Sequence, residues 1–361
     1  MRVLLSGYYG FGNLGDEALL EVIVDRIGRR FPGVEVEVLS QTPGATQAAF
    51  GVAATPRWEW RRVREAIARA DVVVSGGGGL LQNATSTRSL VYYTAVLREA
   101  IAAKRKAMIF AQSIGPLDVW GRFLVRRFCR GVARATVRDE RSRELLHALL
   151  PKTEIERTAD PVFLYDAADE AIDLSAEGLG PESGRYAVVS VRKASGARDV
   201  VPLLRRAVDR LSERHGIRVA FLPLGGSPDA EISTDVIRLC KSAPVLLPAC
   251  PLARAAAAIR GAHVVLGMRL HALILAARYA VPFLALAYDP KVAALCEDLR
   301  YPLAPLWKAD GPHLADTDVD DLVDALVERR DELGAHLRAR VDVVRASAER
   351  NFDVLGELLR E

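Results

Sequence analysis

Residues 2–31 read RVLLSGYYGFGNLGDEALLEVIVDRIGRRF, and this stretch decides the fold. An apolar run at residues 2–6 predicts a strand, and a glycine-rich segment follows it. From about Asp16 to Phe31 the apolar residues recur at helical spacing, which predicts an amphipathic helix. A strand, a glycine loop and a helix in this order form the first unit of an open parallel α/β sheet.

The same alternation continues along the chain and predicts one parallel sheet in each half. In the first half, the further predicted strands are residues 34–40, 71–75, 107–112 and 135–137. An acidic, alanine-rich segment with Gly and Pro at residues 166–184 then interrupts the pattern. Beyond this segment, the predicted strands are residues 186–192, 218–223, 245–247, 263–266 and 283–287.

This organisation predicts an α/β protein made of two Rossmann-like, doubly wound domains. We assign residues 1–170 to an N-terminal domain and residues 171–361 to a C-terminal domain, with terminal helices from about residue 316. Such a pair resembles the glycosyltransferase-B architecture, in which the active site lies in the cleft between the two domains. This likeness is an analogy of fold and carries no function by itself.

The composition is that of a soluble, folded protein. Of the 361 residues, 50% are hydrophobic and 26% are charged, which excludes a disordered, collagenous or coiled-coil chain. Lys and Arg number 49 against 46 Asp and Glu, so the net charge gives no reason to expect nucleic acid as a partner. Any anionic partner must therefore be bound by a local group of cations.

The cysteines and the apolar runs predict a cytoplasmic protein. Cys129, Cys240, Cys250 and Cys296 form no C-x-x-C pair, which favours reduced thiols over a disulfide framework or a zinc site. The first apolar run is too short for a signal peptide. The most apolar later stretch, residues 270–288, contains charged residues and a proline, so we expect no transmembrane anchor.

The loop after the first strand contains G-x-G-x-x-G at residues 10–15, a pattern that also occurs in dinucleotide-binding folds. Asp16 and the adjacent Glu17 place negative charge where a pyrophosphate would bind, which disfavours that interpretation. A plain alternative is a tight glycine turn with Asp16 as the helix cap. Tyr8 and Tyr9 instead favour a loop that faces a sugar, with Tyr8, Asn13 and Asp16 as acceptor-binding candidates.

Two more polar loops follow predicted strands. Gly76–Gly79 come directly after the strand at residues 71–75, and such a run has an entropic cost that a plain connection need not have. We therefore expect a ligand or a facing backbone close to it, although a flexible surface loop is the alternative. From this run and from residues 112–116 we take Gly77, Gly78, Gln82 and Gln112 as further acceptor-binding candidates.

Cations follow strands at several places, and they are the candidates for binding an anion. Arg269 and His271 lie where a predicted strand leads into an apolar helix, although a histidine in such a place is often a core residue. Lys291 ends the next strand, where a solvated turn is the alternative. Arg138 and Arg192 also close strands, and each could pair with a local carboxylate; we take Asp160 as structural.

Taken together, these motifs resemble the polysaccharide pyruvyl transferase family, with the closest likeness to its CsaB branch. The resemblance covers about residues 2 to 300 and rests on motifs in matching order: residues 7–17 (GYYGFGNLGDE), 76–79 (GGGG), 112–116 (QSIGP), 136–140 (TVRDE), 268–272 (MRLHA) and 288–291 (YDPK). Several ordered motifs are far more specific than any single one.

The resemblance implies transfer of pyruvate from phosphoenolpyruvate to two hydroxyls of an N-acetylmannosamine residue in a lipid-linked cell-wall precursor. The product is a cyclic ketal that anchors surface-layer proteins. It also implies that Arg269, His271 and Lys291 contact the donor, and we add Arg138 as a fourth cation. We assign His271 as the acid, and Asp16 as the base or an acceptor ligand. We expect no metal and no cofactor, since phosphoenolpyruvate is a co-substrate.

Two other classes of function remain open at this stage. A nucleotide-sugar glycosyltransferase of the same fold would use a similar glycine loop and similar cations. A non-catalytic protein that binds an anionic surface is the second alternative. Separately, five arginines fall on one face of a predicted helix at residues 122–134: Arg122, Arg126, Arg127, Arg130 and Arg134. This face predicts salt-sensitive contact with the inner face of an anionic membrane, through which the enzyme reaches a lipid-linked acceptor. An ordinary amphipathic helix with a solvated basic face is the alternative. The sequence is also compatible with an oligomer.

Overall fold

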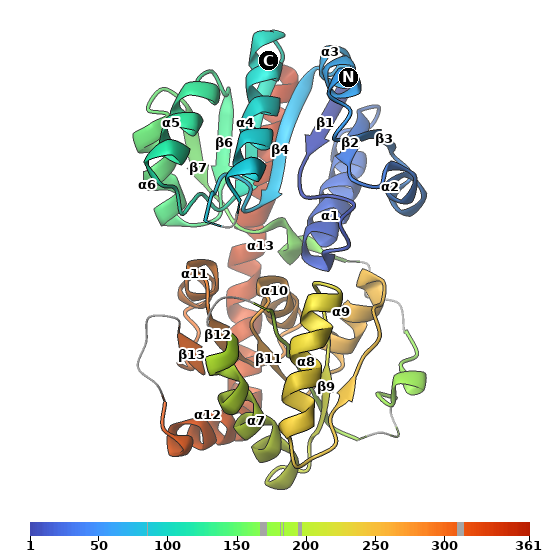
Figure 1. Ribbon diagram of the computed structural model, residues 1–361, viewed down its shortest axis with the longest axis vertical. Helices are drawn as coiled ribbons and strands as arrows, with labels where there is room; N and C mark the ends of the chain where they lie inside the picture. The colour runs from blue at the N-terminus through green and yellow to red at the C-terminus, as the bar shows by residue number, and fades with distance from the viewer. Residues whose placement is uncertain (85, 167–171, 181, 183, 194–196, 309–313) are drawn as a thin grey trace. The chain divides into compact units, whose positions relative to one another are not determined.

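The protein is described by a computed structural model that divides into two compact units (Figure 1). It describes residues 1–84, 86–166, 172–180, 182, 184–193, 197–308 and 314–361. Unit 1 comprises Met1–Leu164 and Arg345–Glu361, and unit 2 comprises Tyr165–Val344. The boundary expected at residues 170 and 171 lies outside the described residues. The terminal helices were expected in the second domain, whereas the last 17 residues belong to unit 1.

Unit 1 is built on a seven-stranded parallel sheet with the strand order β3-β2-β1-β4-β5-β6-β7. Its strands are β1 (Arg2–Ser6), β2 (Glu35–Ser40), β3 (Ala53–Pro56), β4 (Val72–Gly78), β5 (Lys106–Gln112), β6 (Arg134–Val137) and β7 (Glu154–Arg157). The helices between them are α1 (Leu14–Arg30), α2 (Pro43–Phe50), α3 (Trp60–Arg69), α4 (Thr87–Ala102), α5 (Val119–Phe128) and α6 (Glu140–Leu149). The strand order reverses between β1 and β4, where doubly wound sheets bind ligands.

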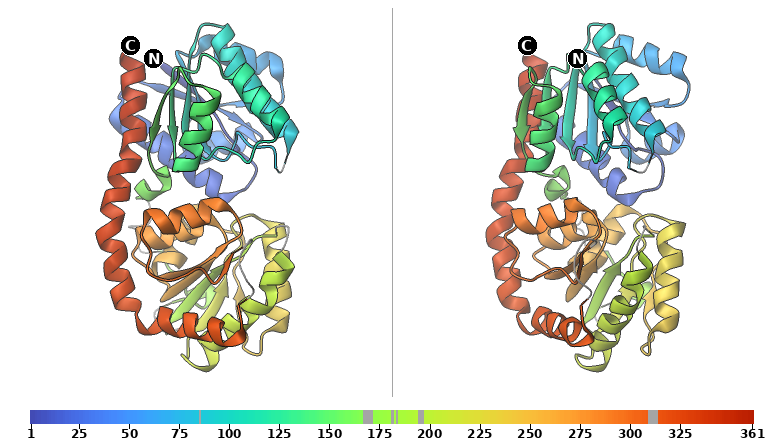
Figure 2. Two further views of the ribbon diagram at one scale, coloured as in Figure 1. Left: turned by 90° about the vertical axis from the view of Figure 1, so that its left-hand side faces the viewer. Right: turned by 60° about the vertical axis from the view of Figure 1, so that its left-hand side comes forward.

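Helices cover both faces of this sheet. One hydrophobic core joins the strands to α3, α4, α5 and α6. On the other face, α1 packs beside the C-terminal part of α13 (Arg330–Arg360), which Figure 2 shows alongside the strands of unit 1. The rings of Phe110 and Phe352 meet edge to face there with centroids 5.2 Å apart, and Lys106 Nζ donates to the carbonyl of Leu358 at 2.9 Å. These contacts place the end of the chain in unit 1.

Unit 2 repeats the design with a six-stranded parallel sheet of order β10-β9-β8-β11-β12-β13. Its strands are β8 (Tyr186–Ser190), β9 (Arg218–Phe221), β10 (Val245–Leu246), β11 (Val264–Gly267), β12 (Phe283–Ala287) and β13 (Trp307–Lys308). Its helices are α7 (Ala197–Glu213), α8 (Ser227–Leu239), α9 (Leu252–Arg260), α10 (Leu270–Arg278), α11 (Pro290–Asp298), α12 (Asp316–Glu328) and the start of α13. The prediction of two Rossmann-like domains is therefore confirmed.

Two local expectations were wrong. Gly76, Gly77 and Gly78, expected to follow the strand at residues 71–75, belong to that strand, because β4 continues through Gly78. The helix expected over residues 122–134 ends at Phe128, and Arg134 begins β6 instead. Arg134 pairs there with Glu154 at 2.8 Å and with Glu361 at 2.6 Å, so it does not share the face of the other arginines.

Within the described ranges, no helix is both long and apolar enough to cross a lipid bilayer.

Candidate functional site

The polar loops of unit 1 meet at the carboxyl ends of its central strands, because parallel strands end at a common edge. The loops after β4 and β5 are joined by backbone hydrogen bonds. Ser113 N donates to Gly78 O at 2.9 Å, Gly115 N to Leu81 O at 2.8 Å, and Asn83 N to Pro116 O at 3.2 Å. The two loops therefore act as one structural element, which carries the candidates Gly77, Gly78, Gln82 and Gln112.

The glycine run allows α1 to approach the end of β4. Gly77 and Gly78 have φ angles of +67° and +79°, which other residues rarely adopt. A Cβ atom on Gly77 would lie 2.9 Å from a methyl carbon of Leu19, and one on Gly78 would lie 3.1 Å from Oδ1 of Asp16. The close approach expected from the sequence is thus made by side chains of α1, and it places the Asp16 carboxylate against the backbone of Gly78.

Asn13, rather than Asp16, caps α1. Its side-chain oxygen accepts a hydrogen bond from Gly15 N at 3.1 Å, which leaves the Asp16 carboxylate in the first turn. Glu17 Oε1 accepts from Gly10 N at 2.8 Å and so closes the loop on itself. Burial raises the pKa of Glu17, although hydrogen bonds from the loop amides partly offset this.

The two tyrosines of this loop have different positions. Tyr9 is buried, and its hydroxyl donates to Gly76 O at 2.7 Å, so it serves packing. Burial and the nearby Asp16 carboxylate raise its pKa well above the usual value. Tyr8 is 37% exposed and stacks on Phe11 with ring centroids 4.0 Å apart. Tyr8 therefore remains the candidate for contact with a sugar.

Gln112 is fully buried at the end of β5. Its Nε2 donates to both the carbonyl and the hydroxyl of Ser75 at 2.8 Å. Its Oε1, like the Ser6 hydroxyl on β1, is buried without a hydrogen-bond partner among the described residues. Buried polar atoms are nearly always satisfied, so these two mark the carboxyl edge around β1, β4 and β5 as a candidate polar binding region.

Arg138 follows β6 and forms a buried ion pair with Asp160; the two side chains are 7% and 5% exposed. Its guanidinium also donates to Gly78 O at 3.0 Å and Ser113 Oγ at 3.1 Å. Arg138 therefore supports the joined loops after β4 and β5, and the local carboxylate considered in the sequence analysis is Asp160. Its Nε has no acceptor among the described residues.

A second buried arginine, Arg57, was not recognised from the sequence. It is 3% exposed, donates to Gly7 O at 2.9 Å, and has aromatic rings on several sides. Its guanidinium carbon lies 4.3 to 5.3 Å from the ring centroids of Phe11, Trp58, Tyr92 and Tyr93. These cation–π contacts stabilise the loop after β1, and Trp58 leaves half of its surface exposed beside it.

In unit 2, Arg269 lies at the end of β11 and begins α10 as its N-cap. It forms a bidentate pair with Asp229 of α8, with Nε–Oδ2 at 2.7 Å and an Nη2–Oδ1 distance of 2.6 Å. The Asp229 side chain is 1% exposed and that of Arg269 is 15% exposed. Arg269 is thus held in one orientation, as recognition of a planar anion requires.

Asp229 was also missed by the sequence analysis. It lies in the first turn of α8 and accepts a hydrogen bond from Gly225 N at 2.8 Å. Residues 225–229 read GGSPD, a pattern that is typical of a helix start. This pattern could have drawn attention to Asp229. That signal does not show that the acid pairs with an arginine 40 residues later.

Further cations lie at the same edge of the unit 2 sheet. Arg192, which follows β8, donates to the Tyr288 hydroxyl at 2.8 Å. Burial raises the pKa of Tyr288, while the Arg192 and Arg269 guanidinium groups act in the opposite direction. Both arginines are therefore close enough to Tyr288 to interact with it electrostatically.

His271 and Lys291 extend this group of charges. His271 is half-buried in the first turn of α10. Lys291 is in the first turn of α11, its Nζ lies 3.7 Å from Asp289 Oδ2, and its side chain is 25% exposed. The helices α8, α10 and α11 all begin at this edge, so free amides add to its positive potential. The edge is suited to an anion with more than one negative group.

The Gly225→Ala substitution tests the orientation of Arg269. An added Cβ would lie 1.8 Å from the Arg269 guanidinium, so the side chain must leave its place beside Asp229. We expect a large loss of activity and a lower melting temperature of unit 2. Gly44→Ala is the control, because a Cβ there meets nothing within 4 Å. Equal activity of both variants would show that the orientation of Arg269 is unimportant.

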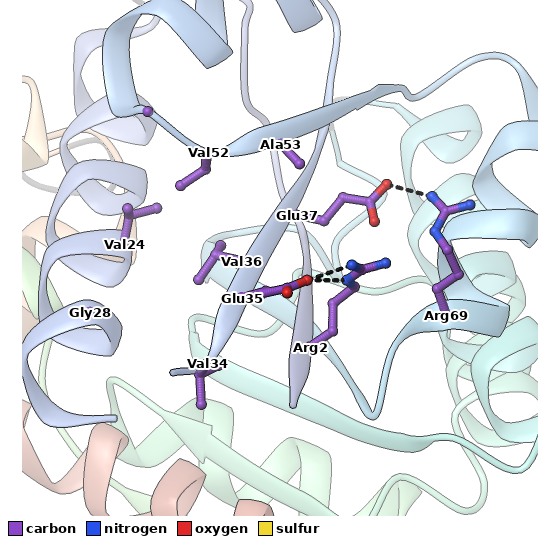
Figure 3. A pocket seen from close by; sticks show the side chains of 11 residues that line it. Arg2, Val24, Gly28, Val34, Glu35, Val36, Glu37, Val52, Ala53 and Arg69 are labelled. Carbon is purple, nitrogen blue, oxygen red and sulfur yellow. Dashed lines mark hydrogen bonds and ion pairs between the residues drawn. The ribbon is translucent and has the colours of Figure 1, made fainter. Parts of the chain in front are cut away.

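Two cavities lie away from the candidate residues. In unit 1, a cavity of about 560 Å³ opens at the amino ends of β1, β2 and β3 (Figure 3). Figure 3 shows Arg2 bonded to Glu35 and Arg69 bonded to Glu37 at this cavity. A cavity of about 300 Å³ lies at the amino ends of β9 and β10 in unit 2. Neither cavity is lined by a candidate residue. The charged side chains that line the cavity of unit 1 are already paired with one another.

The four cysteines are free thiols in the structure. Within the part of the chain that the structure describes, no three His, Cys, Asp or Glu side chains are grouped as metal ligands.

A family model described as polysaccharide pyruvyl transferase matches residues 13–290, which is most of the chain. The chain belongs to the polysaccharide pyruvyl transferase family. The matched region begins at Asn13, after Tyr8, and ends at Pro290, just before Lys291. It includes the loops after β4 and β5 of unit 1, and Arg192, Arg269 and His271 of unit 2. Pyruvyl transfer to a polysaccharide is therefore the activity of this family, and the protein is a transferase. No curated protein matches the chain in sequence.

Solved structures share the fold over the whole chain. MnaA of Staphylococcus aureus, in a co-structure with UDP, has a TM-score of 0.70 at 10% identity, covering 100% of this chain and 97% of that one. UDP-GlcNAc 2-epimerase of Neisseria meningitidis, bound to UDP-GlcNAc, has a TM-score of 0.67 at 12% identity, and the match covers 100% of both chains. An O-GlcNAc transferase mutant of Thermobaculum terrenum has a TM-score of 0.54 at 17% identity, and the match covers 99% of this chain and 67% of that one. They show a glycosyltransferase-B-type fold.

Proposed function

We propose that this pyruvyl transferase uses phosphoenolpyruvate as its donor and binds it at the carboxyl edge of unit 2. The observation that carries this proposal is the group of basic side chains there: Arg269 is oriented by Asp229, and Arg192 follows β8. His271 and Lys291 lie in the first turns of α10 and α11. Phosphoenolpyruvate has a phosphate and a carboxylate, which are the groups that oriented arginines and helix N-termini bind best.

The acceptor is proposed to be an N-acetylmannosamine residue of a lipid-linked cell-wall precursor, and the product a cyclic ketal that anchors surface-layer proteins. The loops of unit 1 support an acceptor role, because Tyr8 offers an exposed ring and Asp16 a carboxylate. Asn13, Gln82, Gln112 and the backbone of Gly77 and Gly78 belong to the same sheet edge. Aromatic faces and polar loop groups are suited to the apolar faces and hydroxyls of a sugar.

The proposed reaction forms two C–O bonds and breaks one. His271 protonates the methylene carbon of phosphoenolpyruvate, and the first acceptor hydroxyl attacks the adjacent carbon. Phosphate leaves, and the second hydroxyl attacks the same carbon to close the ketal. Of the two hydroxyl protons, one replaces the proton that His271 gave, and the other leaves with the phosphate. Asp16 is the proposed base, and Arg269 and Lys291 hold the negative groups.

A thermal-shift comparison of two ligands tests the donor. We expect phosphoenolpyruvate to raise the melting temperature, because a ligand that binds only the folded state stabilises it. UDP-GlcNAc should have no effect. A shift with UDP-GlcNAc and none with phosphoenolpyruvate would instead favour a nucleotide-sugar glycosyltransferase, the alternative that the UDP-bound structural neighbours raise.

Replacing Lys291 with alanine should mainly raise the KM for phosphoenolpyruvate. One lost charge-assisted hydrogen bond costs about 1.5 to 3 kcal/mol, which corresponds to a rise of about tenfold to a hundredfold. Lys241→Ala is the control, because that side chain is 70% exposed and its nearest carboxylate is 3.9 Å away. If Lys291→Ala leaves the KM for phosphoenolpyruvate unchanged, Lys291 is a solvated residue of a turn.

A further inference from the structure

The helix α5 of unit 1 exposes apolar side chains that the sequence analysis did not place on its surface. Val119 is 87% exposed, Trp120 55% and Phe123 50%. The rings of Trp120 and Phe123 are stacked, with centroids 5.1 Å apart. Leu124 and Val125 lie on the buried side and hold the helix on its sheet. The three exposed residues therefore form an apolar strip that makes no contribution to the core.

Arginines lie beside this strip and within it. At about 100° per residue, Arg122 and Arg126 fall on one side of Val119 and Phe123, and Arg127 falls between Phe123 and Trp120. Arg130 is exposed in the turn after the helix. We call these seven residues the α5 face: Val119, Trp120, Arg122, Phe123, Arg126, Arg127 and Arg130.

The arginines of the α5 face are not used for ion pairs. Arg122 donates to the carbonyl of Leu117 at 3.3 Å, and Arg126 contacts that of Ala148 at 3.5 Å. Among the residues that the structure describes, none of the four has a carboxylate partner within 4 Å. Other exposed arginines of unit 1 do have one, such as Arg62 with Glu59 and Arg64 with Glu99. The α5 face thus keeps its positive charge.

The combination of aromatic side chains and unpaired arginines matches the interface of an anionic bilayer. Tryptophan and phenylalanine bury their rings at the boundary between headgroups and acyl chains. Arginines beside them attract anionic headgroups, at about 1 kcal/mol for each charge near the surface. The charge complementarity selects an anionic lipid over a neutral one.

The α5 face is also next to the candidate acceptor region. The chain enters α5 directly from the loop after β5, and Asp118 N donates to Asn83 Oδ1 at 3.1 Å, which ties the start of α5 to the loop after β4. We infer that the α5 face docks unit 1 on an anionic phospholipid bilayer and so brings these loops to a lipid-linked acceptor. The second part of this inference rests on the proposed function.

Vesicle co-sedimentation tests the docking. Phosphatidylcholine vesicles with and without phosphatidylglycerol are mixed with the full chain at about 0.05 M and about 0.5 M salt. We expect binding only with phosphatidylglycerol and only at low salt. Arg126→Glu with Arg127→Glu should weaken it by about tenfold or more, and so should Trp120→Ala with Phe123→Ala. Arg238→Glu with Leu239→Ser, an exposed basic and apolar pair on α8, should leave it unchanged.

Tryptophan fluorescence locates the contact on the protein. Brominated acyl chains should quench the wild-type emission, and Trp120→Phe should remove most of that quenching while the protein still binds. Absence of vesicle binding, binding that both α5 variants retain, or quenching that survives in Trp120→Phe would each overturn the inference. Neither donor nor acceptor is present in these experiments, so their failure is distinguishable from failure of the proposed pyruvyl transfer.

Discussion

Replacing His271 with alanine is expected to lower the turnover of phosphoenolpyruvate by at least about a hundredfold while the protein stays folded. A positioned general acid contributes about 10² to 10⁴ to a rate, and protonation of the methylene carbon has no other proposed donor here. The side chain is half-buried in the first turn of α10, so its removal leaves the packed side of that helix intact. Phosphate release in a single turnover measures the effect.

His147→Ala is the matched control, because that imidazole is exposed on α6 of unit 1. Its turnover should equal that of the wild type. Both variants should keep the wild-type melting temperature to within a few degrees. A folded His271→Ala protein with near-normal turnover would show that His271 is not the acid and would return it to the class of core histidines.

Replacing Arg138 with methionine should have the largest effect on stability. The change leaves the Asp160 carboxylate buried without its cation, and removal of one partner of a buried pair costs about 3 to 5 kcal/mol. Hydrogen exchange in β4, β5 and β6 would report the loss within unit 1. Arg143→Met, which removes an exposed pair with Glu140, should change the stability little, because surface ion pairs contribute little. Equal effects of the two changes would contradict the role of the buried pair.

The double change Arg138→Met with Asp160→Leu separates stability from donor binding. Apolar side chains of similar size often replace a buried ion pair without loss of stability, so protection of β4 to β6 should largely return. If Arg138 also holds a negative group of phosphoenolpyruvate, the stable double variant remains inactive. Normal turnover in that variant would limit Arg138 to supporting the loops at Gly78 and Ser113.

In unit 1, the central strands were predictable, while the edge strands were not. β1, β4 and β5 are apolar over most of their length, because they are buried on both faces of a parallel sheet. β3 and β7 are short strands at the two ends of the unit 1 sheet, with sequences AATP and EIER that have no apolar run. Their pairing is decided by the neighbouring strand, and no local pattern reveals it.

The candidate residues could be found because parallel strands end at one edge, so residues that follow strands share it. Tyr8, Gln112, Arg269 and Lys291 were recognised in this way. Their partners were not. Asp229 is 40 residues from Arg269, and Arg57 follows a weak strand while the rings of Tyr92 and Tyr93 come from α4. Such contacts are set by packing across elements, which one sequence read alone does not show.

Mass spectrometry of the acceptor after incubation tests the central claim most directly. A synthetic diphospholipid that carries N-acetylmannosamine linked to N-acetylglucosamine is incubated with phosphoenolpyruvate and the full chain, and released phosphate is measured in the same sample. We predict that the glycan gains one pyruvate as a ketal, with one phosphate released for each pyruvate added. An unmodified glycan with phosphoenolpyruvate, together with sugar transfer when UDP-GlcNAc replaces it, would contradict this account.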